Sequence, residues 1–209
     1  APEDDSVSLP AEWLHSKPVQ RDRQRLQNSS LRQEMEEETL ALTWAKTRLM
    51  SDDPSKGLGK ARARSLMPQR MLEVFGTQQQ QCDIISAYFV PTRAGVAQLL
   101  ALKRKGVKIA ILTNSLAAND VSIVHAGYAK WRKKLLRHGI ALYELKPQAG
   151  VPEAPHDRGL TGNSGSSLHA KTFSVDQKTL FIGSFNFDPR SAVLNTEMGL
   201  VIESTALAG

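Results

Sequence analysis

A short stretch near the end of the chain carries an imidazole, an ammonium, a hydroxyl, an amide and a carboxylate at fixed spacing. Its members, in chain order, are His169, Lys171, Asp176, Gly183, Ser184, Asn186 and Glu197. From the histidine to the asparagine the spacing reads H-x-K-x4-D-x6-G-S-x-N. A neutral imidazole is a nucleophile near neutral pH, and cationic or neutral donors stabilise the oxygens of a phosphate. The set therefore suits attack on phosphorus.

The surrounding residues predict the strands that gather this set on one patch. The stretch 168–175 is rich in β-branched and aromatic residues and ends in a polar turn, which is typical of a strand entering a hairpin. Two further strands, predicted at 180–182 and 196–203, bring the later members back beside the first. Alternate side chains of a strand share a face, so we expect His169 and Lys171 to point the same way.

Each member of the set has an expected role. A carboxylate bonded to the second ring nitrogen of a histidine fixes its tautomer and stabilises the positive charge that develops, and Glu197 is the candidate for this. The candidate donors to the phosphate oxygens are Lys171, Ser184 and Asn186. Asp176 is expected to be structural, because an aspartate in a turn readily bonds nearby backbone N–H groups. We expect neither a metal nor another cofactor.

This pattern closely resembles the signature of the phospholipase D superfamily. The flanking text is similar to the cardiolipin synthase-type branch, in the segments SAYFVP (86–91), GVKIAILTNSLAANDVSIVHAGY (106–128) and SFNFDPRSAVLNTEMGLVIES (184–204). The resemblance implies a phospholipase D-like fold. It also implies that His169 is the nucleophile that forms a phosphohistidine, with Glu197 orienting it and with Lys171, Ser184 and Asn186 binding phosphate around the structural Gly183.

Members of that family usually carry two such motifs, and the second histidine protonates the leaving alcohol. This chain has one convincing copy. A second H-x-K-x4-D spacing at His15, Lys17 and Asp22 has Pro18 directly after its lysine, which would interrupt a strand ladder, and we interpret it as chance. The other half of the site is therefore expected from a missing part of a longer chain or from a second copy in a homodimer.

The substrate is left open by charge, since a net charge of +6 fits any anionic substrate. The first hypothesis is an enzyme that hydrolyses a phospholipid or transfers its phosphatidyl group to an alcohol. The alternative enzyme is a homodimeric nuclease of the same superfamily, although a nucleic-acid partner is less expected. A third hypothesis is an isolated half-domain that binds phosphate-bearing ligands without turnover.

The composition of the chain indicates its cellular location. The apolar fraction of 41% sustains a core, and the absence of eighteen consecutive apolar residues predicts no membrane span. The first residues, APEDDSVSLP, are neither basic nor apolar, which argues against a signal peptide. We therefore expect a cytoplasmic location or peripheral contact with a membrane. A single cysteine, Cys82, excludes an internal disulfide.

The alternation of predicted strands and helices indicates an α/β fold, with a mixed, mostly parallel sheet flanked by helices. Gly106 and Gly139 fall where helix C-caps belong. Residues 1–65 are expected to form a polar N-terminal extension or connector with one helix, which runs from residue 29 or 30 to about residue 50. Residues 66–209 are expected to form the catalytic half-domain.

Four further residues lie where an α/β sheet usually binds ligands. Thr113 and Asn114 end a predicted strand, and ligands gather beyond the carboxyl ends of strands in open sheets. With His125 and Tyr128 on the next helix, they are candidates for the lining of the substrate pocket. The alternative is ordinary loop chemistry with a helix N-cap within 119–120.

Overall fold

The computed structural model describes residues 15–75, 80–118, 122–146 and 168–209. The chain divides into two compact units, Ala1–Trp44 and Ala45–Gly209. The first unit contains α2 (Lys17–Gln27) and α3 (Ser30–Glu36), and the side chain of Ser29 caps α3 by accepting a hydrogen bond from the backbone N–H of Arg32.

Two predictions for the N-terminal region are wrong. The single helix expected up to about residue 50 is replaced by two short helices, and β1 (Lys46–Ser51) is a strand of the second unit. The boundary between the units therefore lies near residue 45 rather than 65. The strand forms because it pairs with β7 (Met198–Glu203), about 150 residues further along the chain, and tertiary pairing overrides local helix preference. By contrast, Lys17 and Asp22 lie in a helix, in keeping with the interpretation of their spacing as chance.

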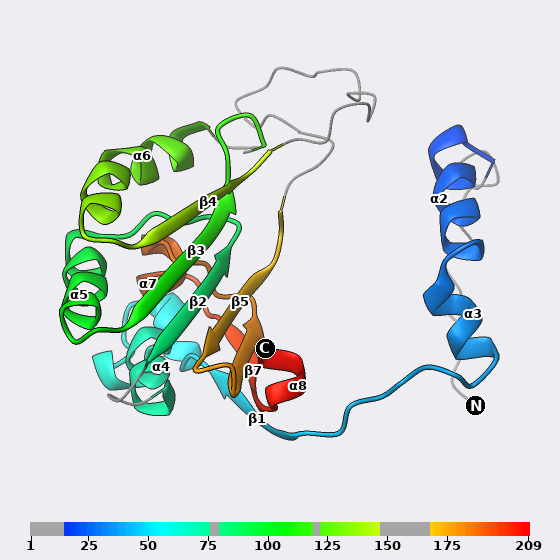
Figure 1. Cartoon of the computed structure of the whole chain (residues 1–209), viewed down its shortest axis with the longest axis horizontal. Helices are drawn as coiled ribbons and strands as arrows, with labels where there is room; N and C mark the ends of the chain where they lie inside the picture. The colour runs from blue at the N-terminus through cyan, green and yellow to red at the C-terminus, as the bar shows by residue number, and fades with distance from the viewer. Residues whose placement is uncertain (1–14, 76–79, 119–121, 147–167) are drawn as a thin grey trace. The chain divides into compact units, whose positions relative to one another are not determined.

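The second unit is built on one seven-stranded sheet (Figure 1). Besides β1 and β7, its strands are β2 (Gln81–Ser86), β3 (Lys108–Asn114), β4 (Ala141–Leu145), β5 (Lys171–Val175) and β6 (Thr179–Gly183). Its helices are α4 (Met67–Phe75), α5 (Arg93–Arg104), α6 (Ser122–Arg137), α7 (Pro189–Val193) and α8 (Thr205–Ala208), with 3₁₀ turns η1 (Pro54–Leu58) and η2 (Ala63–Ser65).

The strand order is β1-β7-β6-β5-β2-β3-β4. The α/β class with a mixed, helix-flanked sheet is confirmed, but the sheet is not mostly parallel. Only the pairings β2–β3 and β3–β4 are parallel, and the other four are antiparallel. Helical crossovers connect β2, β3 and β4 in parallel, whereas β5 and β6 form a tight hairpin, and β7 and β1 return antiparallel beside it.

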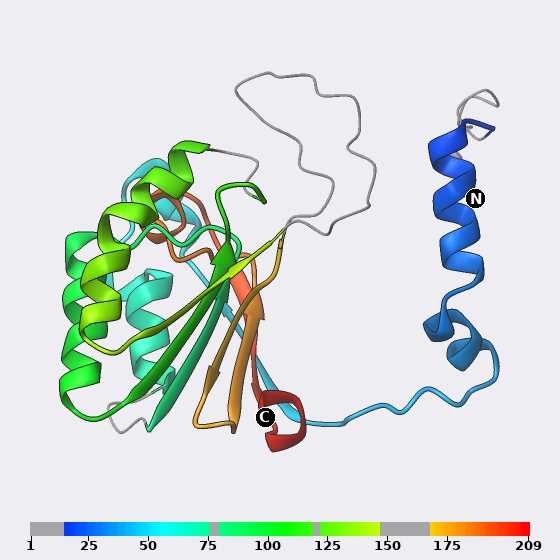
Figure 2. The same ribbon diagram turned by 45° about the horizontal axis from the view of Figure 1, so that its top comes forward.

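The crossover helices end where the sequence predicts. Gly106 and Gly139 have positive φ angles of 88° and 76°, a conformation that glycine adopts without a Cβ clash. Helices α4, α5 and α6 lie on one side of the sheet (Figures 1 and 2). The short α8 packs on the opposite face, where the Ser174 hydroxyl donates to the carbonyl of Ala208.

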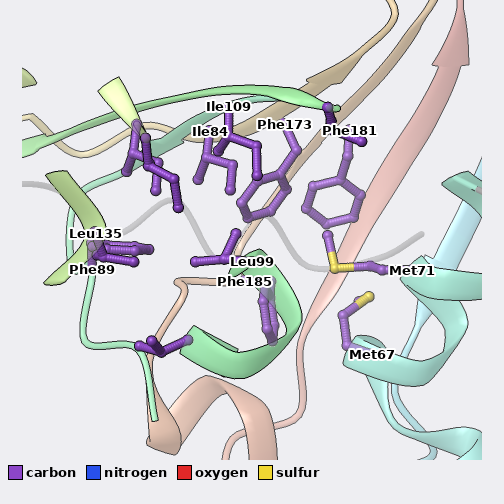
Figure 3. Close-up of a cluster of buried hydrophobic side chains, with 14 of the residues drawn as sticks. Met67, Met71, Ile84, Phe89, Leu99, Ile109, Leu135, Phe173, Phe181 and Phe185 are labelled. Carbon is purple, nitrogen blue, oxygen red and sulfur yellow. The ribbon is translucent and has the colours of Figure 1, made fainter. Parts of the chain in front are cut away.

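The core lies between the sheet and these helices. In Figure 3, Phe173 and Phe181 point from the sheet toward Leu99 of α5 and Phe185. The rings of Phe173 and Phe181 are directly opposite in register, with centroids 5.5 Å apart. This packing fixes β5 and β6 side by side, and the candidate site lies at one end of that pair.

Candidate active site

His169 and Lys171 lie at the start of β5. Lys171 is the first residue of the strand and shares a face with the buried Phe173, while His169 precedes the strand and is exposed. The ammonium group of Lys171 donates to the carbonyl of His169 at 2.8 Å. Within the described residues the imidazole itself makes no hydrogen bond.

The charge on Lys171 depends on two nearby carboxylates. Partial burial lowers the pKa of Lys171 below its ordinary value, and the negative charges of Glu197 and Asp188 oppose that shift. Glu197 and Lys171 are therefore within electrostatic reach of each other. The starts of β5 and β7 lie at the same end of the sheet, because Thr172 pairs with Ile182 of β6 and Gly183 pairs with Gly199.

Glu197 and Ser184 form one unit. The Ser184 hydroxyl donates to the carboxylate of Glu197, which is only 6% exposed. The backbone N–H of Met198 donates to the same hydroxyl oxygen at 3.0 Å, and the N–H of Ser184 donates to the carbonyl of Met198 at 2.9 Å. Since Glu197 meets Ser184 rather than the ring of His169 here, its role in orienting the imidazole stays a prediction.

Asn186 is held with its amide oriented. It is 9% exposed, and its side-chain oxygen accepts from the N–H of Tyr88 at 3.3 Å. Its own backbone N–H donates to the hydroxyl of Ser191 at 3.2 Å. With the oxygen engaged, the NH₂ group of the amide is the part suited to donate to a phosphate oxygen.

Gly183 lets the two strands approach closely at the site. It faces Gly199 across β6 and β7. A Cβ on Gly183 would lie 2.4 Å from the carbonyl oxygen of Met198, and one on Gly199 would lie 2.5 Å from the ring of Phe181. The Phe181 ring therefore packs directly against the backbone at Gly199, and no side chain larger than hydrogen fits at Gly183 or Gly199.

Asp176 lies at the other end of β5. Asp176 and Gln177 have φ angles of 54° and 53°, and with Lys178 they form the turn between the paired residues Val175 and Thr179. The Asp176 carboxylate accepts from the backbone N–H groups of Gln80 and Gln81 at 2.6 and 2.8 Å. It fastens the β5–β6 hairpin to the start of β2, and the length of β5 separates it from His169.

Of the suggested pocket residues, Asn114 supports the site directly. Its amide nitrogen donates to the carbonyls of Leu168 and Ala87 at 3.0 and 3.2 Å, and its oxygen accepts from the N–H of Leu168 at 2.9 Å. Asn114 thus holds the residue immediately before His169. The Thr113 hydroxyl donates to the same carbonyl of Ala87 at 3.4 Å.

Tyr128 joins α6 to β4, and His125 packs against Tyr128. The Tyr128 hydroxyl donates to Glu144 at 3.0 Å, and Arg132 donates to the same oxygen at 2.8 Å. Burial raises the pKa of Tyr128, and the charge of Glu144 adds to the rise. Burial alone would raise the pKa of Glu144, but the hydrogen bonds from Arg132 and Tyr128 hold it below its ordinary value. The buried ring of His125 packs edge-on against Tyr128. The alternative cap within 119–120 lies outside the described residues.

An apolar cavity of about 300 Å³ lies on the same face of the sheet as Lys171. It is bounded by α4, α5 and α7, and its lining includes Phe173, Phe185 and Phe187. These rings are neighbours of the site along the chain, because Phe185 stands between Ser184 and Asn186. Asp188, whose charge acts on Lys171, also lines the cavity.

Two buried charged residues behind the site were not predicted from the sequence. Asp52 and Lys56 are 4% and 3% exposed, and they form an ion pair of 2.6 Å. Both lie in the segment expected to be a connector. The one signal in the sequence is their i,i+4 spacing, which also occurs on ordinary solvated surfaces.

The described residues offer neither a metal site nor a membrane-spanning helix. Among them, no group of three or more His, Cys, Asp or Glu side chains is arranged to hold a metal ion. No helix in those same parts of the chain combines the length and apolar character that crossing a bilayer requires.

Comparison with known proteins identifies close similarity. Residues 71–209 match the family model described as cardiolipin synthase, PLD-like domain. Cardiolipin synthase C of Escherichia coli is 63% identical over 204 residues, which is 98% of this chain and 43% of that protein. Cardiolipin synthase A of Pseudomonas aeruginosa is 27% identical over 151 residues, covering 72% of this chain and 27% of that protein. The chain thus spans less than half the length of these relatives.

Solved structures share the fold at low sequence identity. Nuc of Salmonella typhimurium, a phospholipase D family member, has a TM-score of 0.51 and 21% identity, covering 78% of this chain and 88% of that one. Phosphatidylserine synthase of Haemophilus influenzae has a TM-score of 0.54 and 16% identity, covering 97% of this chain and 45% of that one.

Proposed function

Because this chain belongs to the cardiolipin synthase-type branch of the phospholipase D superfamily, we propose that it supplies one half of an active site that transfers or hydrolyses the phosphatidyl group of a phospholipid. The observation that carries the proposal is 63% identity to a cardiolipin synthase over nearly the whole chain. The contacts of Lys171 with the backbone of His169 and of Ser184 with Glu197, together with the charge effect of Glu197 on Lys171, support it.

In the proposed reaction a ring nitrogen of His169 attacks the phosphorus of the lipid. The new N–P bond forms as the bond from phosphorus to the leaving alcohol breaks, which gives a phosphohistidine and a free alcohol. Lys171 and Asn186 donate to the non-bridging oxygens, whose charge must be held in the transition state. An acceptor alcohol or water then attacks the same phosphorus, breaks the N–P bond and releases the imidazole.

The leaving oxygen needs a proton, which we assign to the second half of the site. That half is either a further part of a longer polypeptide or a second copy of this chain. A length of less than half of the relatives supports the first source. In either case the acid is a second histidine, positioned opposite His169.

Phospholipid is favoured over nucleic acid by the apolar cavity beside the site. Its lining of phenylalanine and aliphatic side chains suits an acyl chain, as is usual for apolar ligand pockets of this size. The exposed basic residues of α6 suit peripheral contact with anionic lipid headgroups. They are Lys130, Arg132, Lys133, Lys134 and Arg137.

The test is release of labelled glycerol headgroup from phosphatidylglycerol vesicles by an assembly that contains this chain and a second motif-bearing half. We expect release in the intact assembly and loss of at least a thousandfold in His169→Ala, on the order of the loss when a nucleophile is removed from a catalytic triad. Asp176→Asn is the matched control, because Asp176 is in the same motif but away from the imidazole.

Two outcomes would contradict the proposal. Cleavage of single-stranded DNA with no action on the vesicles would assign the site to a nuclease. An intact assembly that binds phosphate-bearing ligands but turns over neither substrate would assign it to a binding module.

A further inference from the structure

The buried ion pair of Asp52 and Lys56 stands outside the region that matches the family model. The side chains are 0% and 1% exposed, and the ammonium nitrogen lies 2.6 Å from the carboxylate. Removing two charges from water is costly, and a buried pair is often no more stabilising than apolar residues of the same volume. Stability alone is therefore a weak reason for this pair, and its contacts point to a second one.

Asp52 holds the backbone of Glu197 on both sides. Its carboxylate accepts from the N–H of Glu197 at 2.9 Å, and its own N–H donates to the carbonyl of Glu197 at 2.8 Å. The other carboxylate oxygen accepts from the N–H of Met67, the first residue of α4, at 2.6 Å. Glu197 lies immediately before β7, so these bonds fix it where the strand no longer does.

Lys56 reaches the other side of the site. Its ammonium group donates to the carbonyl of Ser191 at 2.7 Å. The hydroxyl of Ser191, itself 1% exposed, accepts from the backbone N–H of Asn186 at 3.2 Å. One ion pair thereby connects the residue proposed to orient the nucleophile with a residue proposed to bind phosphate.

We propose that Asp52 and Lys56 are positioning residues that hold Glu197 and Asn186 in fixed relation to each other behind the reaction centre. This inference rests on the proposed function for its effect on rate. In this proposal neither side chain touches the substrate: Asp52 acts through the backbone of Glu197, and Lys56 acts through Asp52 and through Ser191, which bonds Asn186. Fully bonded buried networks rigidify their surroundings, and a misplacement of about 1 Å at a reaction centre costs roughly a hundredfold in rate.

The first test is kinetic, in the assembly with both halves. Asp52→Asn and Lys56→Gln each leave one buried charge unpaired, which can prevent folding. The double variant removes both charges together, so it provides a variant that is expected to fold. We expect kcat to fall about a hundredfold in each folded variant with KM nearly unchanged, and no recovery of kcat in the double variant. Lys46→Met is the matched control, because it breaks an exposed ion pair, between Lys46 of β1 and Glu203 of β7, instead of a buried one.

The second test needs no turnover. Glu197 raises the pKa of Lys171, so displacement of Glu197 must lower it further. We expect an NMR titration of labelled lysine in the chain to show a lower Lys171 pKa in the double variant and no change in Lys46→Met.

The outcomes separate the two proposals. If the double variant folds with an unchanged Lys171 pKa and an unchanged kcat, the positioning role is overturned. If the unmodified assembly is inert but the Lys171 pKa still falls in the double variant, the positioning role stands and the proposed function fails.

Discussion

Burial and nearby negative charges shift the pKa of Lys171 in opposite directions, and one substitution can separate the two effects. Partial burial lowers the pKa of this amine, and the carboxylates of Glu197 and Asp188 raise it. An amine is charged below its pKa, so a lower pKa means that the phosphate-binding charge is lost at a lower pH. We therefore expect phosphate binding to weaken on the alkaline side before an ordinary lysine, with its pKa of 10.5, would lose its proton.

Asp188→Asn tests this balance without removing the helix cap. Asp188 caps α7 by accepting from the N–H of Ser191 at 2.9 Å, and asparagine caps a helix about as well. With the negative charge gone, we expect the pKa of Lys171 to fall further and the alkaline limb of phosphate binding to move to lower pH. The measurement is an NMR titration of labelled lysine, with Glu203→Gln as an exposed control. A Lys171 pKa that rises or stays constant would show that Asp188 does not act on the amine.

At the scale of elements, the β6–β7 pairing depends on two facing glycines. A methyl group on Gly199 would lie 2.5 Å from the Phe181 ring and 2.7 Å from the carbonyl oxygen of Ile182. We expect Gly199→Ala to lower the free energy of unfolding by about 1–3 kcal/mol, the usual cost of overpacking, in urea denaturation followed by circular dichroism.

Gly57→Ala is the control for this prediction, because a Cβ there meets nothing within 4 Å. We expect it to change the free energy of unfolding by less than about 0.5 kcal/mol, as for most surface substitutions. Equal losses in the two variants would mean that the close approach of β6 and β7 is not what excludes a side chain at Gly199.

The elements that the sequence predicts well are those with local signals. Helix ends at Gly106 and Gly139 and the polar turn at Asp176 each follow from the chemistry of one or two residues. β1 carries no such signal, because four of its six residues are exposed and its partner strand is distant in sequence. Asp52 and Lys56 are harder still, since charged side chains are rarely buried and only the folded contacts distinguish this pair from a surface one.

The motif predicts which side chains gather, but not how they are paired. Lys171 and Glu197 lie within electrostatic reach of each other. The bond between Ser184 and Glu197 could not be predicted, because it forms where β6 ends and strand alternation no longer applies. Asn114 supports Leu168 from a strand two places away in the sheet, so that contact too depends on the tertiary fold.

At the scale of the whole molecule, the described residues contain one copy of the motif, and we propose that its histidine is the nucleophile. A network of buried bonds runs from Lys56 through Asp52 to Glu197 and Ser184, two of the residues proposed to act in the site. We propose that the other half protonates the departing alcohol. We therefore predict that the covalent step takes place on this half and that it leaves a phosphoryl group on one residue.

Detection of that covalent phosphoryl group is the most direct test of the proposed role of His169. Phosphatidylglycerol labelled at phosphorus is mixed with the two-half assembly, quenched rapidly in base, in which phosphohistidine survives, and the labelled peptides are sequenced. We predict label on the peptide containing His169 and none in His169→Ala. Label on any other residue of the assembly, or full activity in His169→Ala, would contradict the central claim.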